Sequence, residues 1–307
     1  MTTPAPALPD GAAVRRALAI AFPALRVERC ALLGEGWDSQ AWEVNGALVF
    51  RFPKRPIVAD WLRREIALLP ALAPALPAPI PGFTHVAARG SPFAPALPFV
   101  GYPMLRGVFL HEVPERLAPG APLVGHLAAF LGALHAFPVA RAVACGLPAD
   151  SWASWVAEWR TFAAQVLDDG PGALDAASRA WAAATLRDFL AELTLAERPV
   201  APIHRDLNLE HILIDPAGER ITGVIDWGDV TLGDPALDFA GVAAACPPAT
   251  LDALLAAYPR PVDGRFRERA VWYARLAPFH LYTFGRTIAD PATIRAGLAA
   301  IRAVRRS

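Results

Sequence analysis

Two polar loops joined by a short hairpin constrain this chain more than any other part of its sequence. Residues 204–207 (His-Arg-Asp-Leu) and 225–228 (Ile-Asp-Trp-Gly) form the loops. Between them, residues 212–214 and 221–225 are apolar and predict two strands, with the turn residues Pro-Ala-Gly-Glu at 216–219. The pattern therefore places a carboxylate-bearing loop at each end of a hairpin.

This arrangement predicts that Asp206, His211 and Asp226 converge on one spot. Such a constellation suits metal-assisted phosphoryl transfer, which needs one carboxylate to orient and deprotonate a hydroxyl and further ligands to hold Mg²⁺ against nucleotide phosphates. The alternative is that Asp206 and Asp226 only cap turns. Two such loops in the right order, 20 positions apart, favour the catalytic interpretation.

The two loops resemble the His-Arg-Asp-Leu-x-x-x-Asn and Asp-Phe-Gly loops of protein kinases. Here they contain His204-Arg205-Asp206-Leu207-x-x-x-His211 and Asp226-Trp227-Gly228. The combination is similar to the aminoglycoside phosphotransferase family, which has a protein-kinase-like fold. Residues 210–215 and 225–229 look most like the 2''-phosphotransferase branch and the related macrolide phosphotransferases.

The resemblance implies a catalytic role for Asp206 and metal-ligand roles for His211 and Asp226, with Mg²⁺ as cofactor and ATP or GTP as phosphate donor. His211 departs from the usual asparagine, and hard Mg²⁺ prefers oxygen ligands. Two roles therefore stay open for His211: direct ligation, or orienting Asp226 or a metal-bound water.

The N-terminal part of the chain predicts a nucleotide lid. A helix is expected from Asp10 to about Phe22, followed by a strand over residues 26–33 and a second strand ending at Val44. Asn45-Gly46 is a strong hairpin signal before a third strand, residues 48–52. The loop between the first two strands contains Gly34, Gly36 and Ser39, and the resemblance implies that it covers the phosphates.

Arg51 occupies the third-strand position where kinases carry a lysine that contacts the phosphates and pairs with a helix glutamate. The helix predicted over residues 57–69 offers Glu65 as that partner. Arginine and lysine are not interchangeable, so Lys54 is an alternative phosphate ligand. A plain surface ion pair is the alternative for Arg51 and Glu65.

Residues 83–88 and 97–103 predict two more strands, which complete a five-stranded antiparallel sheet. By resemblance, residues 104–107, including Met104 and Arg106, form the hinge that binds the purine. Tyr102 would stand at the gate of the nucleotide pocket, where a bulky residue is associated with GTP use in the 2''-phosphotransferase branch. Simple core packing is the alternative for Tyr102.

The resulting expectation is an α+β, protein-kinase-like fold with two lobes. Residues 1–106 would form the nucleotide-binding lobe, with the hinge at about 104–107, and residues 107–307 a mainly helical lobe with the catalytic loop and substrate site. Helical spacing of apolar residues supports several helices after Pro122, including residues 249–258, 264–288 and 291–305. Aromatic stripes in these helices predict core packing. Asp150 and Asp234 are expected to cap helices.

Composition excludes several classes of partner. The formal net charge is zero, which gives no footprint for nucleic acid or an anionic membrane. Residues 66–88 lack charged side chains, but their prolines would interrupt a membrane-spanning helix. Three widely spaced cysteines predict neither a disulfide framework nor a metal site. A cytoplasmic monomer that binds a nucleotide and a small molecule is therefore expected.

The expected function is transfer of the γ-phosphate of ATP or GTP to a hydroxyl of an antibiotic, with an aminoglycoside as the first choice. Residues 239–307 contain four acids and ten arginines, the wrong sign for a polycation site. Asp168, Asp169, Asp188, Glu192 and Glu197 could supply an acidic wall instead. The alternatives are a macrolide phosphotransferase, a metabolic kinase of a sugar or amino alcohol, and a non-catalytic nucleotide-binding module.

Overall fold

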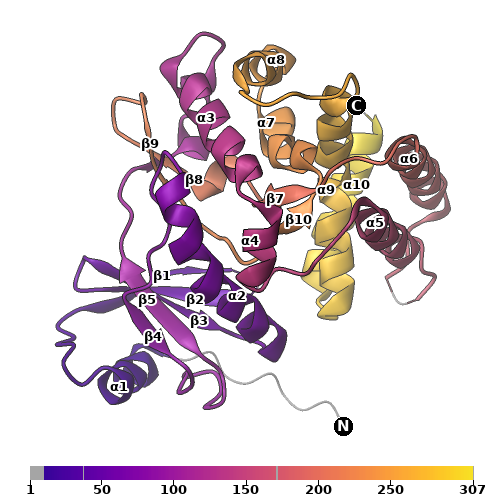
Figure 1. Ribbon diagram of the computed structural model, residues 1–307. Coiled ribbons are helices and arrows are strands. Elements are labelled where there is room, and N and C mark those ends of the chain that lie inside the picture. Colours follow the sequence, from indigo (N-terminus) through magenta and orange to yellow (C-terminus); the bar gives the residue numbers. More distant parts are fainter. Residues whose placement is uncertain (1–9, 37, 171, 307) are drawn as a thin grey trace. The chain divides into compact units, whose positions relative to one another are not determined.

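The computed structural model describes residues 10–36, 38–170 and 172–306. The chain forms two compact units (Figure 1). Unit 1 contains the chain up to Val113 together with Ala140–Leu147 and Glu210–Val230. Unit 2 contains Pro114–Val139, Pro148–Leu209 and the chain from Thr231 onward. The metal loop predicted around Asp226 thus belongs with the N-terminal sheet, and Asp206 belongs to the helical unit.

Unit 1 is built around a five-stranded antiparallel sheet with the order β1-β2-β3-β5-β4. This confirms the predicted sheet, although the first strand begins at Cys30, later than expected. Its strands are β1 (Cys30–Glu35), β2 (Ser39–Val44), β3 (Leu48–Pro53), β4 (His85–Ala87) and β5 (Phe99–Pro103). A second sheet, with the order β6-β8-β9, consists of β6 (Val108–Phe109), β8 (Ile212–Ile214) and β9 (Ile221–Val224). The predicted hairpin is therefore present as β8 and β9.

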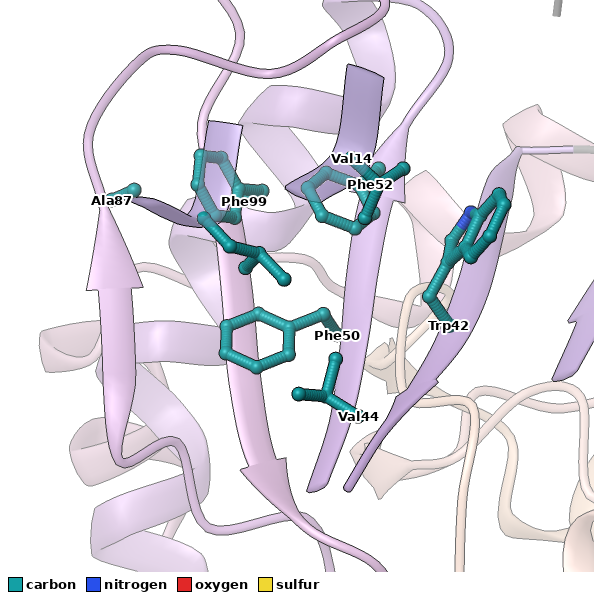
Figure 2. Close-up of a cluster of buried hydrophobic side chains, with 8 residues drawn as sticks. Val14, Trp42, Val44, Phe50, Phe52, Ala87 and Phe99 are labelled. Atoms are coloured by element: carbon teal, nitrogen blue, oxygen red, sulfur yellow. The ribbon is translucent and has the colours of Figure 1, made fainter. Parts of the chain in front are cut away.

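Helix α1 (Gly11–Ala21) covers one face of the five-stranded sheet. Asp10 caps it as predicted, accepting a hydrogen bond from the Ala13 N–H at 2.8 Å. The core on this face consists of Val14, Leu18, Trp42, Val44, Phe50, Phe52, Ala87 and Phe99 (Figure 2). Because side chains alternate along a strand, Arg51, between Phe50 and Phe52, points to the opposite face.

Helix α2 (Pro56–Leu72) supplies Glu65 to that opposite face. Helix α2 continues to Leu72, past the predicted end at residue 69 and through Pro70. Pro70 has no N–H to donate to the carbonyl one turn earlier, so the helix loses one hydrogen bond there and ends soon afterwards. A short 3₁₀ turn, η1 (Ala73–Ala75), follows. The Pro79 carbonyl then accepts the Val224 N–H at 3.0 Å, which ties the proline-rich connector to β9.

Unit 2 is mainly helical, as predicted. Its elements are η3 (Pro114–Leu117), α3 (Pro122–Ala136), α5 (Trp152–Val166), α6 (Ala176–Thr194), β7 (Ala201–Ile203), β10 (Thr231–Gly233), η5 (Pro235–Phe239), α7 (Ala240–Ala245), α8 (Pro248–Ala257), α9 (Phe266–Thr287) and α10 (Pro291–Arg306). Three short elements lie at or near the borders of the units: η2 (Leu110–Glu112), α4 (Val139–Ala144) and η4 (Leu209–His211). Strands β7 and β10 pair antiparallel.

Glycines let α9 and α10 approach closely. A Cβ on Gly297 of α10 would lie 2.5 Å from the Tyr282 Cα, and one on Gly285 of α9 would lie 2.7 Å from the Ile294 N. The aromatic stripes of this unit are core, as predicted: Trp155, Trp159 and Tyr273 are buried. The cap of α5 was predicted wrongly. Ser151, and not Asp150, accepts the Ser154 N–H at 3.2 Å, since serine at this position completes a capping box with Ser154.

Asp234 caps η5 as predicted and also reaches into a buried network. Its carboxylate pairs with the buried Arg269 (Nε–Oδ2 2.7 Å) and accepts the Tyr273 hydroxyl at 3.1 Å. Arg269 also pairs with Asp263, and Trp155 donates to Tyr273 at 2.9 Å. In the part of the chain that the structure describes, no helix is both long and apolar enough to cross a bilayer.

Candidate active site

The backbone of the predicted catalytic loop is held by hydrogen bonds to one buried carboxylate in unit 2. The backbone N–H groups of His204 and Arg205 donate to Oδ2 and Oδ1 of Asp238, each at 2.8 Å. Charge-assisted bonds of this kind are stronger than neutral ones. Arg205 adopts φ 74°, a left-handed conformation that is uncommon for residues other than glycine. Asp238 therefore holds the backbone in the shape that presents the next residue, Asp206.

Asp206 is partly exposed. Its Oδ1 accepts the side-chain amide of Asn208 at 2.6 Å, and its carbonyl accepts the Asn208 N–H at 3.0 Å. Gly241 fits against this loop so closely that a Cβ there would lie 2.3 Å from the Leu207 carbonyl oxygen. The Asn208 amide and the packing of Gly241 thus fix the loop that contains this carboxylate.

Asp238 is itself part of a buried chain of hydrogen bonds that the sequence analysis missed. Its Oδ2 lies 3.0 Å from His135 Nε2, and His135 Nδ1 lies 2.7 Å from the Tyr258 hydroxyl. Asp238 and His135 are 1% and 2% exposed. Both are isolated ionisable residues in apolar helical segments, and that is the signal that could have identified them.

We expect Asp238→Ala to destabilise the protein and to slow the reaction. The substitution removes the acceptor of two backbone N–H groups and of His135, and unsatisfied buried donors cost about 1–3 kcal/mol each. The melting temperature should fall by roughly 5–10 °C in a thermal scan. Asp252→Ala is the control, because Asp252 is exposed and pairs with Arg267 on the surface. Equal effects of the two substitutions would contradict the anchoring role.

In unit 1, the second loop brings His211 and Asp226 together. The Ile225 N–H donates to the His211 carbonyl at 2.9 Å, which closes the end of the β8–β9 hairpin. Asp226 has φ 64°, and its carboxylate Oδ2 lies 3.7 Å from His211 Nε2. The Asp226 side chain is 55% exposed and that of His211 is 12% exposed. A left-handed aspartate aimed outward from a packed hairpin is a strained arrangement of the kind found at functional sites.

Arg51 and Glu65 form a buried ion pair, not the surface pair that was the alternative. Arg51 Nη1 lies 2.7 Å from Glu65 Oε2, and Nη2 lies 3.1 Å from Oε1. Burial, the largest single influence, lowers the pKa of Arg51, but Glu65, Asp226 and Tyr102 together outweigh burial and raise that pKa above its usual value. The guanidinium is therefore charged.

Gly228 shows how close this ion pair lies to the second loop. A Cβ placed on Gly228 would be 3.8 Å from Glu65 Oε1, 3.9 Å from Arg51 Nη2 and 3.9 Å from Asp226 Oδ1. One point in unit 1 is thus surrounded by a cation and two carboxylates. The intervening Trp227 is fully buried and donates to the Val224 carbonyl at 2.9 Å, which fixes the loop.

Asp226 and His211 fit a Mg²⁺ ion whose coordination is completed by water and by nucleotide phosphates. Among the residues that the structure describes, no group of three or more His, Cys, Asp or Glu side chains gathers into a cation site. Mg²⁺ commonly keeps several waters and binds through one or two carboxylates plus substrate phosphates. The exposed Asp226 carboxylate is a suitable oxygen ligand, and the neighbouring imidazole is suited to holding a water.

The glycine loop comprises the end of β1 and the turn into β2. Among the residues that the structure describes, a Cβ on Gly34 would meet nothing within 4 Å, and one on Gly36 would meet only the Ser39 carbonyl at 3.8 Å. Packing against the described residues therefore does not explain these glycines. The Ser39 hydroxyl oxygen is buried and has no hydrogen-bond partner within the described residues. A polar ligand under the loop would account for both observations.

Residues near the predicted hinge are held by the β2–β3 hairpin. The Met104 N–H donates to the Ala47 carbonyl at 2.8 Å, and the Arg106 guanidinium donates to the Gly46 carbonyl. These groups are engaged with protein, so a purine would meet other backbone groups of this segment. Tyr102 is buried in β5 and packs edge-on against Phe83, and burial raises the pKa of its hydroxyl to about 12.

The acidic wall expected in unit 2 is largely neutralised by arginines. Four of its five members pair with arginine, and Glu192 is also buried: Asp168 with Arg286, Asp169 with Arg179, Asp188 with Arg187, and Glu192 with Arg265 and Arg198. Each of these four carboxylates therefore has an arginine partner within the unit, while the side chains of Asp168, Asp169 and Asp188 remain 60%, 81% and 54% exposed.

Comparison with known proteins identifies relatives of this fold. The sequence matches the model of the phosphotransferase enzyme family over residues 29–271. No curated protein matches the sequence. The GDP and kanamycin complex of APH(2")-IIIa is similar with a TM-score of 0.84 and 26% identity, covering 95% of this chain and 98% of that chain. The GDP complex of wild-type aminoglycoside 2'-phosphotransferase-IIIa gives 0.83 and 26%, covering 96% and 98%.

Macrolide 2'-phosphotransferase MphH from Brachybacterium faecium is also similar, with a TM-score of 0.71 and 23% identity over 95% of this chain and 97% of that chain. At this identity the likeness shows the fold alone. The fold is therefore α+β and protein-kinase-like, as predicted. Because the family model spans most of its length, this chain belongs to the phosphotransferase enzyme family.

Proposed function

We propose that this enzyme transfers the γ-phosphate of ATP or GTP to a hydroxyl group of an antibiotic, with an aminoglycoside as the first candidate. The observation that carries the proposal is the cluster around Gly228, where Arg51, Glu65 and Asp226 lie within about 4 Å of one point. A charged fork and an outward carboxylate together suit a nucleotide with its metal. The structures similar at 26% identity contain GDP, and one of them also contains kanamycin.

In this proposal Asp206 would hold the acceptor hydroxyl and take its proton, since its carboxylate is partly exposed and is positioned by the Asn208 amide. Asp226 would hold Mg²⁺ directly and His211 would hold a metal-bound water. The bound metal would neutralise charge on the phosphates during transfer. Arg51 and the loop containing Gly34, Gly36 and Ser39 would position the phosphates. A cytoplasmic, monomeric enzyme remains the expectation.

We expect GTP to be used at least as well as ATP. Tyr102 is buried in β5 next to the predicted hinge, and in the proposed nucleotide pocket its large side chain would narrow the space for adenine. Tyr102→Ala should improve kcat/KM for ATP relative to GTP. Steady-state kinetics with both nucleotides on both proteins measure this ratio. A preference for ATP in the wild type that Tyr102→Ala leaves unchanged would show that the residue is not a gate.

A macrolide, or another bulky acceptor with little charge, is the second candidate, and a specific surface favours it. Glu158 and Phe162, four residues apart, lie on one face of α5. Glu158 pairs with Arg205 of the catalytic loop, and Phe162 stacks on His280 with ring centroids 4.3 Å apart. The surface beside the loop is thus an ion pair and an aromatic stack, not a carboxylate array.

The test is a nucleotide-consumption screen with ATP and with GTP across aminoglycosides, macrolides and small amino alcohols. Product mass should increase by one phosphate for at least one antibiotic. Turnover of amino alcohols alone would indicate a metabolic kinase. Absence of phosphoryl transfer to every compound, with nucleotide binding intact, would favour a non-catalytic binding module.

A further inference from the structure

The chain contains 28 arginines and a single lysine, Lys54. This lysine immediately follows β3, and its ammonium contacts the glycine loop. It pairs with the Glu35 carboxylate and donates to the Gly36 carbonyl at 2.7 Å. An ammonium has three donors that can point in different directions, whereas a guanidinium is a flat fork. The single lysine side chain of this protein therefore contacts the glycine loop, which is predicted to cover the phosphates.

The arginine at the position of the kinase lysine uses part of its hydrogen-bonding capacity on Glu65. Its Nη1 and Nη2 atoms each donate to one oxygen of Glu65. A guanidinium has about five N–H donors, so others remain for a phosphate. A second cation near the glycine loop would add to the positive charge that Arg51 offers the phosphates.

Hydrogen bonds around Lys54 allow its ammonium to change partner while its backbone stays attached to the glycine loop. The Lys54 backbone N–H donates to the Asp38 carbonyl at 2.8 Å, so the main chain stays attached when the side chain moves. Glu35 accepts from Gln40 at 3.2 Å, and Gln40 accepts from the buried Trp42 at 3.0 Å. The carboxylate therefore keeps a partner of its own.

Resting on the proposed function, we propose that Lys54 is a nucleotide-phosphate ligand and that Glu35 competes with the nucleotide for it. With no nucleotide bound, Lys54 bridges Glu35 and the Gly36 carbonyl. When a nucleoside triphosphate binds, the ammonium exchanges Glu35 for phosphate oxygens and keeps the Gly36 carbonyl. The buried Ser39 hydroxyl lacks a partner within the described residues and would serve the same ligand. Glu35 thus lowers the affinity for the nucleotide, because the phosphates must displace its carboxylate from Lys54 and the two negative groups repel each other.

Two substitutions should have opposite effects on affinity. Lys54→Met should weaken binding of the Mg²⁺ complexes of ATP and GTP by about 10-fold or more, the loss expected for one charge-assisted hydrogen bond. Glu35→Gln should tighten the same binding by roughly 2- to 5-fold, since a competitor for Lys54 is removed. Affinity for adenosine and guanosine should not change in either variant, because they carry no phosphate. Calorimetry measures all four ligands.

Arg29→Met is the matched control, since it removes an exposed cation that pairs with Glu43 elsewhere on the same sheet. It should leave every affinity unchanged. If Lys54→Met and Glu35→Gln both weaken triphosphate binding, the pair is a structural tether and the proposal is overturned. If the wild-type protein binds neither nucleotide, the proposed phosphoryl transfer fails instead, so the two failures are distinguishable.

A labelling experiment gives independent evidence, because the chain has only one lysine side chain. An acyl-phosphate derivative of ATP or GTP carries its acyl group on the terminal phosphate. The neutral Lys54 amine would attack the acyl carbonyl, form an amide and release the nucleoside triphosphate, with the proton passing to solvent. Peptide mapping should find the label on Lys54, and excess triphosphate should block it. Saturating reagent that labels only the N-terminal amine would contradict the proposal.

Discussion

Asp206→Asn is expected to lower kcat by about 10²- to 10⁴-fold, the usual cost of losing a positioned acid or base. This corresponds to roughly 3 to 5 kcal/mol of barrier. The transition state of phosphoryl transfer is loose, so the larger task that we propose for Asp206 is to hold the acceptor hydroxyl in line with the γ-phosphate. Nucleotide Kd should stay nearly unchanged, because Asp206 lies in the helical unit and the nucleotide residues proposed above lie in unit 1.

The measurement has two parts: kcat with the best acceptor found in the screen, and nucleotide Kd by calorimetry. Glu210→Gln is a suitable control, since Glu210 is an exposed acid only four residues further along the chain. If kcat holds within a few-fold in Asp206→Asn, Asp206 is not the catalytic carboxylate. If Kd collapses together with kcat, the loop is structural.

Asp226→Ala is expected to abolish turnover and to weaken binding of the Mg²⁺–nucleotide complex. Its carboxylate is the exposed oxygen donor beside Arg51 and Glu65, and it would hold the metal in the ground state and the transition state alike. Titration with Mg²⁺ at fixed nucleotide should show a large loss of metal dependence in the variant. Substantial activity with an unchanged Mg²⁺ requirement would remove Asp226 from the metal site.

His211→Asn is the comparison for Asp226→Ala and should retain partial activity. Asparagine occupies this position in protein kinases and can also hold a water or a metal through its amide oxygen. A folded but fully inactive His211→Asn protein would mean that the imidazole does more than hold a water. The 3.7 Å separation of His211 and Asp226 would then point to direct orientation of the carboxylate by the ring.

The sequence predicts well those parts of the fold that depend on residues close together in the chain, such as strands and turns. Alternating apolar residues and the Asn45-Gly46 turn specify β2 and β3, and the register of this hairpin then places Arg51 on the face opposite the Phe50 core. The glutamate partner of Arg51 was predicted from its place on the next helix, and the structure contains that pair. Local signals were weaker at element ends, as at Pro70 and Ser151.

Long-range polar contacts could not be read from the sequence in the same way. Asp238 supports residues 204 and 205 from more than 30 positions away, and nothing local marks it as their partner. Similarly, counting acids between Arg141 and Val200 suggested a negative wall, because a count does not show that Arg286 reaches Asp168 or that Arg265 reaches Glu192. Charge balance along a segment predicts surface potential only when its pairing partners lie in the same segment.

The hydrogen bonds from the predicted catalytic loop to Asp238 limit where this enzyme can be recombined with a relative. Asp238 connects the loop to His135 and Tyr258, so segments that together reach from His135 to Tyr258 must be inherited from one parent. The packing of Gly132 supports this, because a Cβ there would lie 2.3 Å from the Pro259 ring, beside Tyr258. Recombination points placed before α3 or after Pro259 would keep this set intact. Exchange of α9 and α10 from another parent could then alter acceptor choice while the catalytic loop keeps its native support.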